Sequence, residues 1–429
     1  MSPFRGLIYF LEGIINNMGS EEGRKIALKR AEELKESISD YLEFRNNIPT
    51  GFSEWEAIQN RQQKIKDYFN VSEKEWESWH WQLENRIHDV ETLSEFLNLT
   101  DQEKEDIGLT GSKYRWAVVP YYLSLIDPDN PRDPVRLQCI PTRMEYDDHC
   151  GAMDPMGEEF TSPAPAITRR YPDRLIINIT NQCAMYCRHC QRRRNIGETD
   201  HQTPKDQIAA AIEYIAQNEE IRDVLLTGGD AFMLDDDTLD WILTELDNIP
   251  HVEIKRLGSR TPVTLPYRIT DDLCKMLSKH LPLYVNTHFN NPQEITPVSK
   301  EACFSLARAG IGLGNQAVLL KGVNNHPLVM RKLNHELLKI MVRPYYIFHA
   351  KGVQGTSHLR TRVEEGIEIM EKLRGYTSGL AIPTYIVNAP KGYGKTPMLP
   401  EYLLSMGADK LLIRTWEKRV LEYENDEDV

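Results

Sequence analysis

Three cysteines, separated first by three residues and then by two, are the strongest chemical signal in the sequence. Cys183, Cys187 and Cys190 lie in one short segment that follows a β-rich run at residues 175–179. Three thiolates at this spacing can bind three irons of a [4Fe–4S] cluster and leave the fourth iron without a protein ligand. An iron with an open coordination position can bind a substrate or cofactor directly. The pattern therefore predicts an iron–sulfur cluster that takes part in chemistry.

A structural zinc site and three unrelated core cysteines are the plainer interpretations of the same segment. A zinc site would need a fourth ligand nearby, and His189 lies between two of the cysteines, where it is poorly placed to join them. The chain has seven cysteines, an odd number with one tight cluster. Such usage is typical of metal binding in a reducing compartment and not of a disulfide framework. We therefore favour the iron–sulfur cluster.

Two glycines and an aspartate follow the next β-rich run along the chain. Gly228, Gly229 and Asp230 come shortly after residues 224–226. Glycine has no Cβ, so two in succession allow the backbone to come close to a bound ligand. A tight turn is the plainer interpretation of these residues alone. Their order in the chain, after a predicted strand and after the cysteines, favours a ligand-binding turn.

A glycine-rich segment at residues 387–397 presents Lys395 between Gly394 and Thr396. These three residues resemble the end of a nucleotide-binding P-loop, but that motif needs a glycine five positions before Gly394, where this chain has Ala389. A lysine in a glycine-rich loop at a strand end also suits Schiff-base chemistry, in which its amine bonds to a carbonyl carbon. A solvent-exposed loop lysine is the alternative that these residues leave open.

Alternating β-rich and helical segments follow residue 171 and predict the scaffold that positions these residues. Repeated β–α units imply a parallel sheet with right-handed crossovers. Six or more units imply a full or partial barrel, with functional residues at the carboxyl ends of the strands. We therefore expect an α/β fold. The predicted strands are 175–179, 224–226, 253–257, 283–286, 313–320, 342–348 and 384–387, and the clearest predicted helices are 205–217, 237–246 and 364–373.

The first 110 residues show a helical pattern instead. Apolar residues recur at helical spacing over 24–44 and 72–96, and Ser72 begins a candidate capping box. Residues 127–134 and 151–166 are rich in Pro, Gly or Asp and predict extended connections. We expect four regions, which are a helical N-terminal region (1–110), a connector that wraps the core (111–170), the barrel (171–395) and a short C-terminal extension (396–429).

Composition and charge disfavour several classes of function. With 41% hydrophobic and 27% charged residues, the chain has the composition of a globular protein with a substantial core. A formal net charge of −13 disfavours a protein whose main task is binding nucleic acid. The early apolar stretch at residues 7–15 is too short to span a membrane. It also lacks the basic n-region and the small-residue cleavage site of a secretory signal. We expect a cytoplasmic protein that binds neither membranes nor nucleic acids.

From about residue 76 to residue 418 the chain resembles the lysine 2,3-aminomutase family of radical S-adenosylmethionine (SAM) enzymes. Its cysteines match the C-x3-C-x-Φ-C motif of that superfamily, in which Φ is aromatic and His189 supplies the ring. The ordered motifs that carry the resemblance are highly specific together. They are CAMYCRHCQRRR (183–194), LLTGGDA (225–231), GSRTPV (258–263), NTHFN (286–290), GNQAVLLKGVN (314–324), RPYYI (343–347), LRGYTSG (373–379) and GYGKTP (392–397).

The resemblance implies a partial (β/α)6-type radical SAM barrel with three cofactors, namely a [4Fe–4S] cluster, SAM and pyridoxal 5′-phosphate (PLP). It implies that the three cysteines bind the cluster and that Lys395, the catalytic lysine, binds PLP covalently. It also implies that Arg192 binds the substrate α-carboxylate, which suits its bidentate guanidinium. The residues implied to hold the PLP phosphate are Arg170, Tyr171 and Arg174. Those implied to contact SAM are His189, beside the adenine, and Gly228, Gly229, Asp230, His288 and Gln316.

Two positions differ from the lysine enzymes of the family, which place an aspartate at each to bind the distal ammonium group of lysine. Here these positions are Lys351 and Asn388. A cation and an amide donor suit an anionic side chain, whereas a lysine substrate would meet Lys351 as a like charge. We therefore expect L-glutamate as the substrate, converted to β-glutamate by a 1,2-migration of its amino group. A surface lysine and a turn asparagine are the plainer interpretation of either residue alone.

Three other functions stay open. An aminomutase for lysine or another amino acid would share the fold, and a sensor that uses the cluster as an oxygen probe would not cleave SAM. A radical enzyme that modifies RNA or protein would lack a PLP lysine, so the acidic charge and Lys395 disfavour it.

No cysteine follows Cys303, so we expect no zinc site of the kind that C-terminal extensions of lysine enzymes carry. We also expect a reductant such as flavodoxin or ferredoxin as a partner, and an oligomer of identical subunits.

Overall fold

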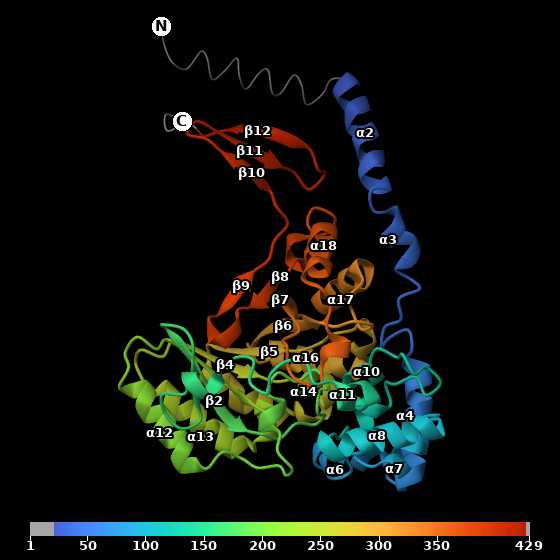
Figure 1. Ribbon diagram of the computed structural model, residues 1–429, viewed down its shortest axis with the longest axis vertical. Helices are drawn as coiled ribbons and strands as arrows, with labels where there is room; N and C mark the ends of the chain where they lie inside the picture. Colours follow the sequence, from blue (N-terminus) through green and yellow to red (C-terminus); the bar gives the residue numbers. More distant parts are fainter. Residues whose placement is uncertain (1–20, 426–429) are drawn as a thin grey trace. The chain divides into compact units, whose positions relative to one another are not determined.

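The computed structural model describes residues 21–425, which belong to two compact units (Figure 1). The first unit ends at Ile48, and its described helices are α2 (Glu21–Glu36) and α3 (Ser39–Phe44). The second unit begins at Pro49 and carries every predicted site residue. The apolar stretch at residues 7–15 lies outside the described part. No helix within that part is both long and apolar enough to cross a membrane.

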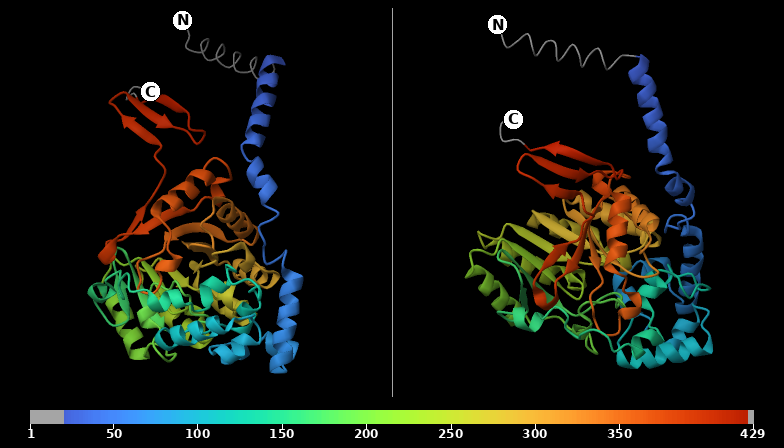
Figure 2. Two further views of the ribbon diagram at one scale, coloured as in Figure 1. Left: turned by 45° about the vertical axis from the view of Figure 1, so that its right-hand side comes forward. Right: turned by 45° about the horizontal axis from the view of Figure 1, so that its top comes forward.

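A nine-stranded sheet forms the centre of the second unit, with its strands side by side in chain order (Figures 1 and 2). Strands β2 to β8 are parallel, while β1 and β9 pair antiparallel to β2 and β8 at the two ends. The strands are β1 (Ile167–Arg169), β2 (Arg174–Thr180), β3 (Asp223–Gly228), β4 (Ile254–Gly258), β5 (Leu283–Thr287), β6 (Gly312–Leu319), β7 (Arg343–His349), β8 (Thr384–Asn388) and β9 (Lys395–Pro397).

Helical crossovers connect each parallel strand to the next, which gives six β/α units followed by β8. The crossover helices are α12 (Lys205–Ala216), α13 (Asp236–Asp247), α14 (Thr261–Thr264) with α15 (Asp271–Leu277), α16 (Pro297–Arg308), α17 (Pro327–Lys339) and α18 (Val363–Leu373). Among the described strands, β1 and β9 do not pair with each other, so the barrel is open. The α/β fold and partial (β/α)6 barrel are therefore confirmed, and all seven predicted strands occur with ends within two residues of those predicted.

Alternation along the strands separates the core from an inner cavity. In β6, Leu313, Ala317 and Leu319 are buried, whereas Gln316 and Val318 between them are half-buried and line the cavity. Successive side chains of a strand point to opposite faces, so one face packs beneath the crossover helices and the other carries the site. The same continuous core includes α12, α13, α16, α17 and α18.

The predicted long helix over residues 72–96 is wrong, because three short helices replace it. Ser72 forms the predicted capping box with Glu75, but Ser78 and Asp89 then cap new helices through their own side chains. Side chains that accept hydrogen bonds from the backbone compete with helix continuation. The first helices of this unit are α4 (Trp55–Phe69), α5 (Glu73–Trp76), α6 (Trp79–Glu84), α7 (Val90–Ser94) and α8 (Asp101–Lys113).

The predicted connections over residues 127–134 and 151–166 contain no α-helix, and short α-helices lie only beside or between them. These helices are α9 (Pro120–Leu123), α10 (Arg136–Cys139) and α11 (Arg143–Asp147), and the second connection includes a 3₁₀ turn at Glu158–Thr161. After β9, the strands β10 (Leu403–Met406), β11 (Lys410–Arg414) and β12 (Val420–Glu424) form a separate antiparallel sheet (Figure 2). The expected region boundaries at residues 110, 170 and 395 stay predictions.

The packing of α18 on β8 supports a stability prediction. A Cβ at Gly366 would come within 2.1 Å of the Tyr385 ring. In Gly366→Ala, the overlap costs about 3 kcal/mol, which exceeds the gain of about 1 kcal/mol in helix propensity. We expect a lower midpoint of thermal unfolding. Gly379→Ala is the control, because a Cβ there would meet no atom within 4 Å. Equal midpoints for the two variants would contradict this packing.

Candidate active site

A cavity of about 280 Å³ lies at the carboxyl ends of the parallel strands. The segment after β2 contributes the three cysteines, and the turn after β3 contributes the Gly-Gly-Asp motif. The segments after β5 and β7 contribute His288 and Lys351, and the β8–β9 hairpin contributes Asn388 and Lys395. Every predicted site residue, drawn from segments far apart in the chain, lines this one cavity. Their individual roles stay predictions.

Hydrogen bonds from neighbouring elements hold the cysteine segment in place. Arg86 donates from Nη1 to the Cys183 carbonyl at 2.8 Å, and the backbone N–H of Arg188 donates to the Gln138 carbonyl at 2.8 Å. The three thiols are free and half-buried. Within residues 21–425, no three Cys, His, Asp or Glu side chains are placed to hold a single metal ion. A cubane cluster takes each thiolate at a different iron, so three thiols that face one cavity fit that cofactor.

The Gly-Gly-Asp turn brings backbone close to the cysteines. Gly228 has a φ of +123°, and a Cβ at Gly229 would lie 2.3 Å from the Gln182 carbonyl oxygen. Only glycine fits both positions without strain. The Asp230 carboxylate accepts hydrogen bonds at 2.6 Å from the Ser259 hydroxyl and from the backbone N–H of the next residue. The turn therefore presents its backbone to the cavity, while its carboxylate binds the segment that follows β4.

The histidines predicted to contact SAM are both neutral. His288 donates from Nδ1 to the Gln316 carbonyl at 2.8 Å, because a carbonyl can only accept. Burial lowers the pKa of His288 to about 4, so its Nε2 is left as an acceptor. Burial also holds the pKa of His189 well below its ordinary value, and its buried Nδ1 has no partner within the described residues. A buried nitrogen without a partner in the cavity wall suits a site that binds a polar ligand.

The β8–β9 hairpin sets Asn388 directly across from Lys395. The backbone N–H of Lys395 donates to the Tyr171 hydroxyl at 2.9 Å, and its Nζ lies 5.5 Å from that ring and 5.8 Å from the Phe348 ring. Burial, followed by the charges of nearby arginines, lowers the pKa of Lys395 to about 8. A larger neutral fraction favours attack on a carbonyl carbon, so this lysine suits Schiff-base chemistry.

Three arginines surround Lys395 and could bind a phosphate. The Arg174 guanidinium lies 4.0 Å from the centre of the Tyr171 ring. Arg170 donates to Glu158 at 2.5 Å, so its charge is partly compensated. Arg256, on β4, also lines the cavity and donates to Asp223 at 2.7 Å. Sequence reasoning missed Arg256, since nothing distinguishes an arginine in a predicted strand from a surface residue.

Glu158 is a second residue that the sequence did not reveal. It lies in the 3₁₀ turn and accepts hydrogen bonds from Arg170, Arg192 and Arg194. Burial would raise the pKa of Glu158, but the three arginines together hold it below its ordinary value. Within residues 21–425, Arg192 uses Nε for this contact and makes no other side-chain hydrogen bond. Its two terminal nitrogens are therefore available for a carboxylate.

Lys351 and Asn388 are donors in the cavity wall without a hydrogen-bond acceptor in the described chain, although the Lys351 Nζ lies 5.9 Å from the centre of the Phe348 ring. Burial, followed by the charge of Arg192, lowers the pKa of Lys351 to about 7. Within residues 21–425, no carboxylate lies within ion-pair distance of its ammonium group, although Glu158 acts on it from farther away. The buried Nδ2 of Asn388 has no hydrogen-bond partner in the described part of the chain. A cation and an amide donor left unpaired in one cavity form a receptor for an anion.

The sequence of this chain is similar to known families and proteins. The family model described as the radical SAM superfamily matches residues 177–331, and the model described as lysine-2,3-aminomutase matches residues 370–429. A glutamate 2,3-aminomutase of Clostridioides difficile (strain 630) is 60% identical over 405 residues, which cover 94% of this chain and 96% of that protein. An L-lysine 2,3-aminomutase of Clostridium subterminale is 50% identical over 367 residues, which cover 85% of this chain and 88% of that protein.

An open (β/α)6 barrel with three cysteines after its first parallel strand defines a radical SAM enzyme. The extent and identity of the matches show more than the class, because they cover most of both chains. The chain belongs to the lysine 2,3-aminomutase family, and it is an aminomutase and hence an isomerase. Membership of the superfamily implies a [4Fe–4S] cluster and SAM, and the cysteine segment and Gly-Gly-Asp turn fit them.

Removing the carboxylate of Glu158 should destabilise the protein. In Glu158→Gln three arginines lose their shared counter-ion, and breaking a buried pair costs about 3 kcal/mol. A group whose folded pKa is depressed stabilises above its unfolded value, here 4.5, and that contribution is lost as the pH falls. We therefore expect a lower unfolding midpoint than wild type at pH 7, with a difference that shrinks below pH 4.5.

The neighbouring exposed residue provides the control for this variant. Glu159→Gln removes the same charge one position along the chain, and the side chain of Glu159 makes no ion pair within residues 21–425. We expect Glu159→Gln to unfold at the wild-type temperature. If Glu158→Gln also matched wild type at pH 7, the charge balance described for the cavity would be wrong.

Proposed function

We propose that this protein is a PLP-dependent radical SAM aminomutase that converts L-glutamate to β-glutamate. One observation carries the proposal. Lys351 and Asn388 line the same cavity, and both are donors without an anionic partner in the described chain. A substrate with a distal carboxylate would satisfy both groups. The similarity to a glutamate 2,3-aminomutase supports this choice, while the lysine enzymes share the fold and much of the sequence.

Electrostatics favours glutamate over lysine as the substrate in this cavity. Two unlike charges about 4 Å apart attract by about 4 kcal/mol at an effective dielectric constant of 20, and two like charges repel by the same amount. A lysine substrate would bring its ammonium group to Lys351 without a carboxylate to offset the repulsion. Glutamate would instead restore the ammonium form of Lys351, because a bound carboxylate raises the pKa of a neighbouring amine.

The proposal gives the remaining residues roles that suit their positions. Arg192 holds the substrate α-carboxylate through its free terminal nitrogens, while Glu158 fixes its orientation. Lys395 attaches PLP, and Tyr171 holds the backbone of that lysine. The hairpin register keeps Asn388 beside Lys395, so the amino end and the distal end of the substrate are fixed relative to one another. When bound, the cofactors supply a covalent hold on the amino group and a radical that removes hydrogen from C3.

The direct test is turnover by the reconstituted protein. Protein prepared without oxygen receives iron, sulfide, PLP, SAM and a reductant, and is offered glutamate or lysine separately. We expect NMR to detect β-glutamate from glutamate and no β-lysine from lysine. Borohydride reduction followed by peptide mass mapping should place PLP on Lys395, which separates a failure of cofactor binding from a failure of substrate choice. Production of β-lysine alone would overturn the assignment to glutamate.

Loss of the positive charge at residue 351 should impair glutamate turnover specifically. In Lys351→Met the distal carboxylate loses its cation, which costs about 2 kcal/mol, or about 30-fold in kcat/KM. The loss should be greatest in KM, because the distal carboxylate is bound equally in the ground state and the transition state.

Lys391→Met is the matched control. Lys391 lies four residues before Lys395, is exposed and does not line the cavity. We expect its kcat/KM for glutamate to equal that of wild type. An undiminished kcat/KM in Lys351→Met, or an equal loss in both variants, would contradict a specific contact between residue 351 and the substrate.

A further inference from the structure

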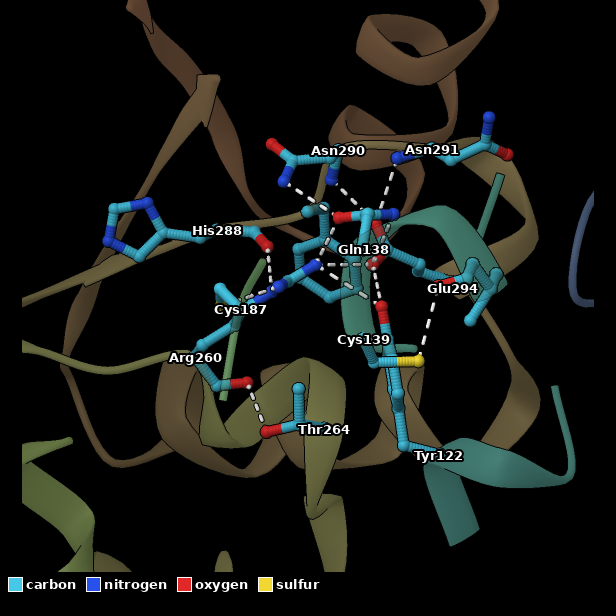
Figure 3. Close-up of polar contacts among 12 residues, drawn as sticks. Tyr122, Gln138, Cys139, Cys187, Arg260, Thr264, His288, Asn290, Asn291 and Glu294 are labelled. Atoms are coloured by element: carbon cyan, nitrogen blue, oxygen red, sulfur yellow. Dashed lines mark hydrogen bonds and ion pairs between the residues drawn. The ribbon is translucent and has the colours of Figure 1, made fainter. Parts of the chain in front are cut away.

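A buried arginine of the cavity wall that was not among the predicted site residues contacts one of the three cysteines. Arg260 follows β4 at the start of α14, and its Nη1 lies 2.9 Å from the Cys187 sulfur (Figure 3). Only 8% of this residue is exposed. Arg260 stands in the GSRTPV motif, but the sequence assigns it no role. Its contact with the sulfur raises the question of what a fixed guanidinium does beside a cluster ligand.

Hydrogen bonds fix all three nitrogens of the Arg260 guanidinium. Its Nε donates to the His288 carbonyl at 3.0 Å, and its Nη2 donates to Glu294 at 2.7 Å and to the Gln138 side chain at 2.5 Å (Figure 3). The guanidinium is planar, so fixing two of its nitrogens also fixes the direction of the third. The Nη1–H bond is therefore directed at the Cys187 sulfur by the protein frame.

Glu294 is the counter-ion of this arginine, and both of its carboxylate oxygens accept further hydrogen bonds. One oxygen accepts from the Tyr122 hydroxyl at 2.6 Å, and the other accepts from the backbone N–H groups of Asn290 and Asn291 at 2.5 and 2.8 Å. Glu294 is completely buried. The pair is close to neutral as a whole, but its positive end contacts the cysteine and its negative end points away. It therefore acts as an oriented dipole at the cluster.

Reduction of a [4Fe–4S] cluster from its 2+ to its 1+ state adds one electron, supplied by an external one-electron reductant, and breaks no bond. The added negative charge is shared by the sulfur ligands, so donors to those sulfurs stabilise the reduced state and raise the reduction potential. Low local polarity strengthens such interactions. A fixed N–H donor with a positive charge behind it should have a large effect of this kind.

We propose that Arg260 is a redox-tuning residue, whose hydrogen bond to Cys187 raises the reduction potential of the cluster and whose effect Glu294 limits. The inference rests on the proposed cluster and goes beyond the proposed reaction. It gives the two partners opposite effects. Loss of the arginine makes the cluster harder to reduce, whereas loss of the glutamate charge makes it easier to reduce. A residue that only held the cysteine segment in place would not produce opposite signs.

The test is a redox titration of the reconstituted holoenzyme without substrate, followed by the EPR signal of the reduced cluster. At a fixed solution potential, Arg260→Met should lower the ratio of reduced to oxidised cluster by about tenfold, equal to about 59 mV for one electron. Glu294→Gln should raise the ratio. Arg260→Met leaves a buried carboxylate without its cation, which costs stability. The double variant Arg260→Met/Glu294→Gln avoids this and should also be harder to reduce than wild type, because it lacks the N–H donor.

Arg268→Met is the matched control for loss of a buried guanidinium. Arg268 is 1% exposed and donates to the carbonyls of Phe232 and Leu234, with no bond to a cysteine in the described chain. We expect its potential to equal that of wild type. Iron content and the wild-type EPR signal are measured first.

The outcomes separate the two levels of the argument. A wild-type protein that binds no cluster would overturn the cofactor assignment and this inference together. A wild-type cluster with unchanged potentials in both the double variant and Glu294→Gln, or shifts of the same sign in the two, would overturn the tuning role alone and leave the proposed reaction intact.

Discussion

A buried cavity with far more positive than negative charge is the constraint on which the rest of the structure depends. Within the described residues, Asp230 is the one carboxylate in its lining, and the cations are Arg170, Arg174, Arg192, Arg256, Arg260, Lys351 and Lys395. Unpaired buried charges are costly, so such a cavity needs anions. Glu158 and Glu294 supply part of the compensation from behind the wall. Under the proposed function a phosphate, two substrate carboxylates and an anionic cluster supply the rest.

The barrel makes this concentration of charge possible because it brings strand ends together. Residues that are more than two hundred positions apart, such as Cys183 and Lys395, meet at one end of a single sheet. The β8–β9 hairpin adds an antiparallel edge that sets Asn388 opposite Lys395. Under the proposed function, covalent attachment of the cofactor and recognition of the substrate side chain therefore lie on adjacent strands of one hairpin. A family that keeps the attachment point can change its substrate by altering a neighbouring residue, without disturbing the fold.

Sequence alone predicted the parts of this structure that depend on local pattern or on resemblance. The strands and crossover helices follow from their periodicity, and the cysteines and Lys395 follow from spacing and motif. Glu158 was not predicted from the sequence, because its role depends on three arginines that only the fold brings close to it. Arg260 stands in a motif, but its contact with Cys187 spans 73 residues and carries no local signal. The predicted helix over 72–96 failed because two capping residues outweighed its apolar spacing.

The most direct test of the central claim, that unpaired donors in a positive cavity select a dicarboxylic amino acid, is a structure of the protein with its cofactors and glutamate. The account predicts that the distal carboxylate accepts hydrogen bonds from the Lys351 Nζ and the Asn388 Nδ2, with the α-carboxylate on Arg192. A distal carboxylate that pointed away from both Lys351 and Asn388, or an α-carboxylate bound in their place, would contradict it.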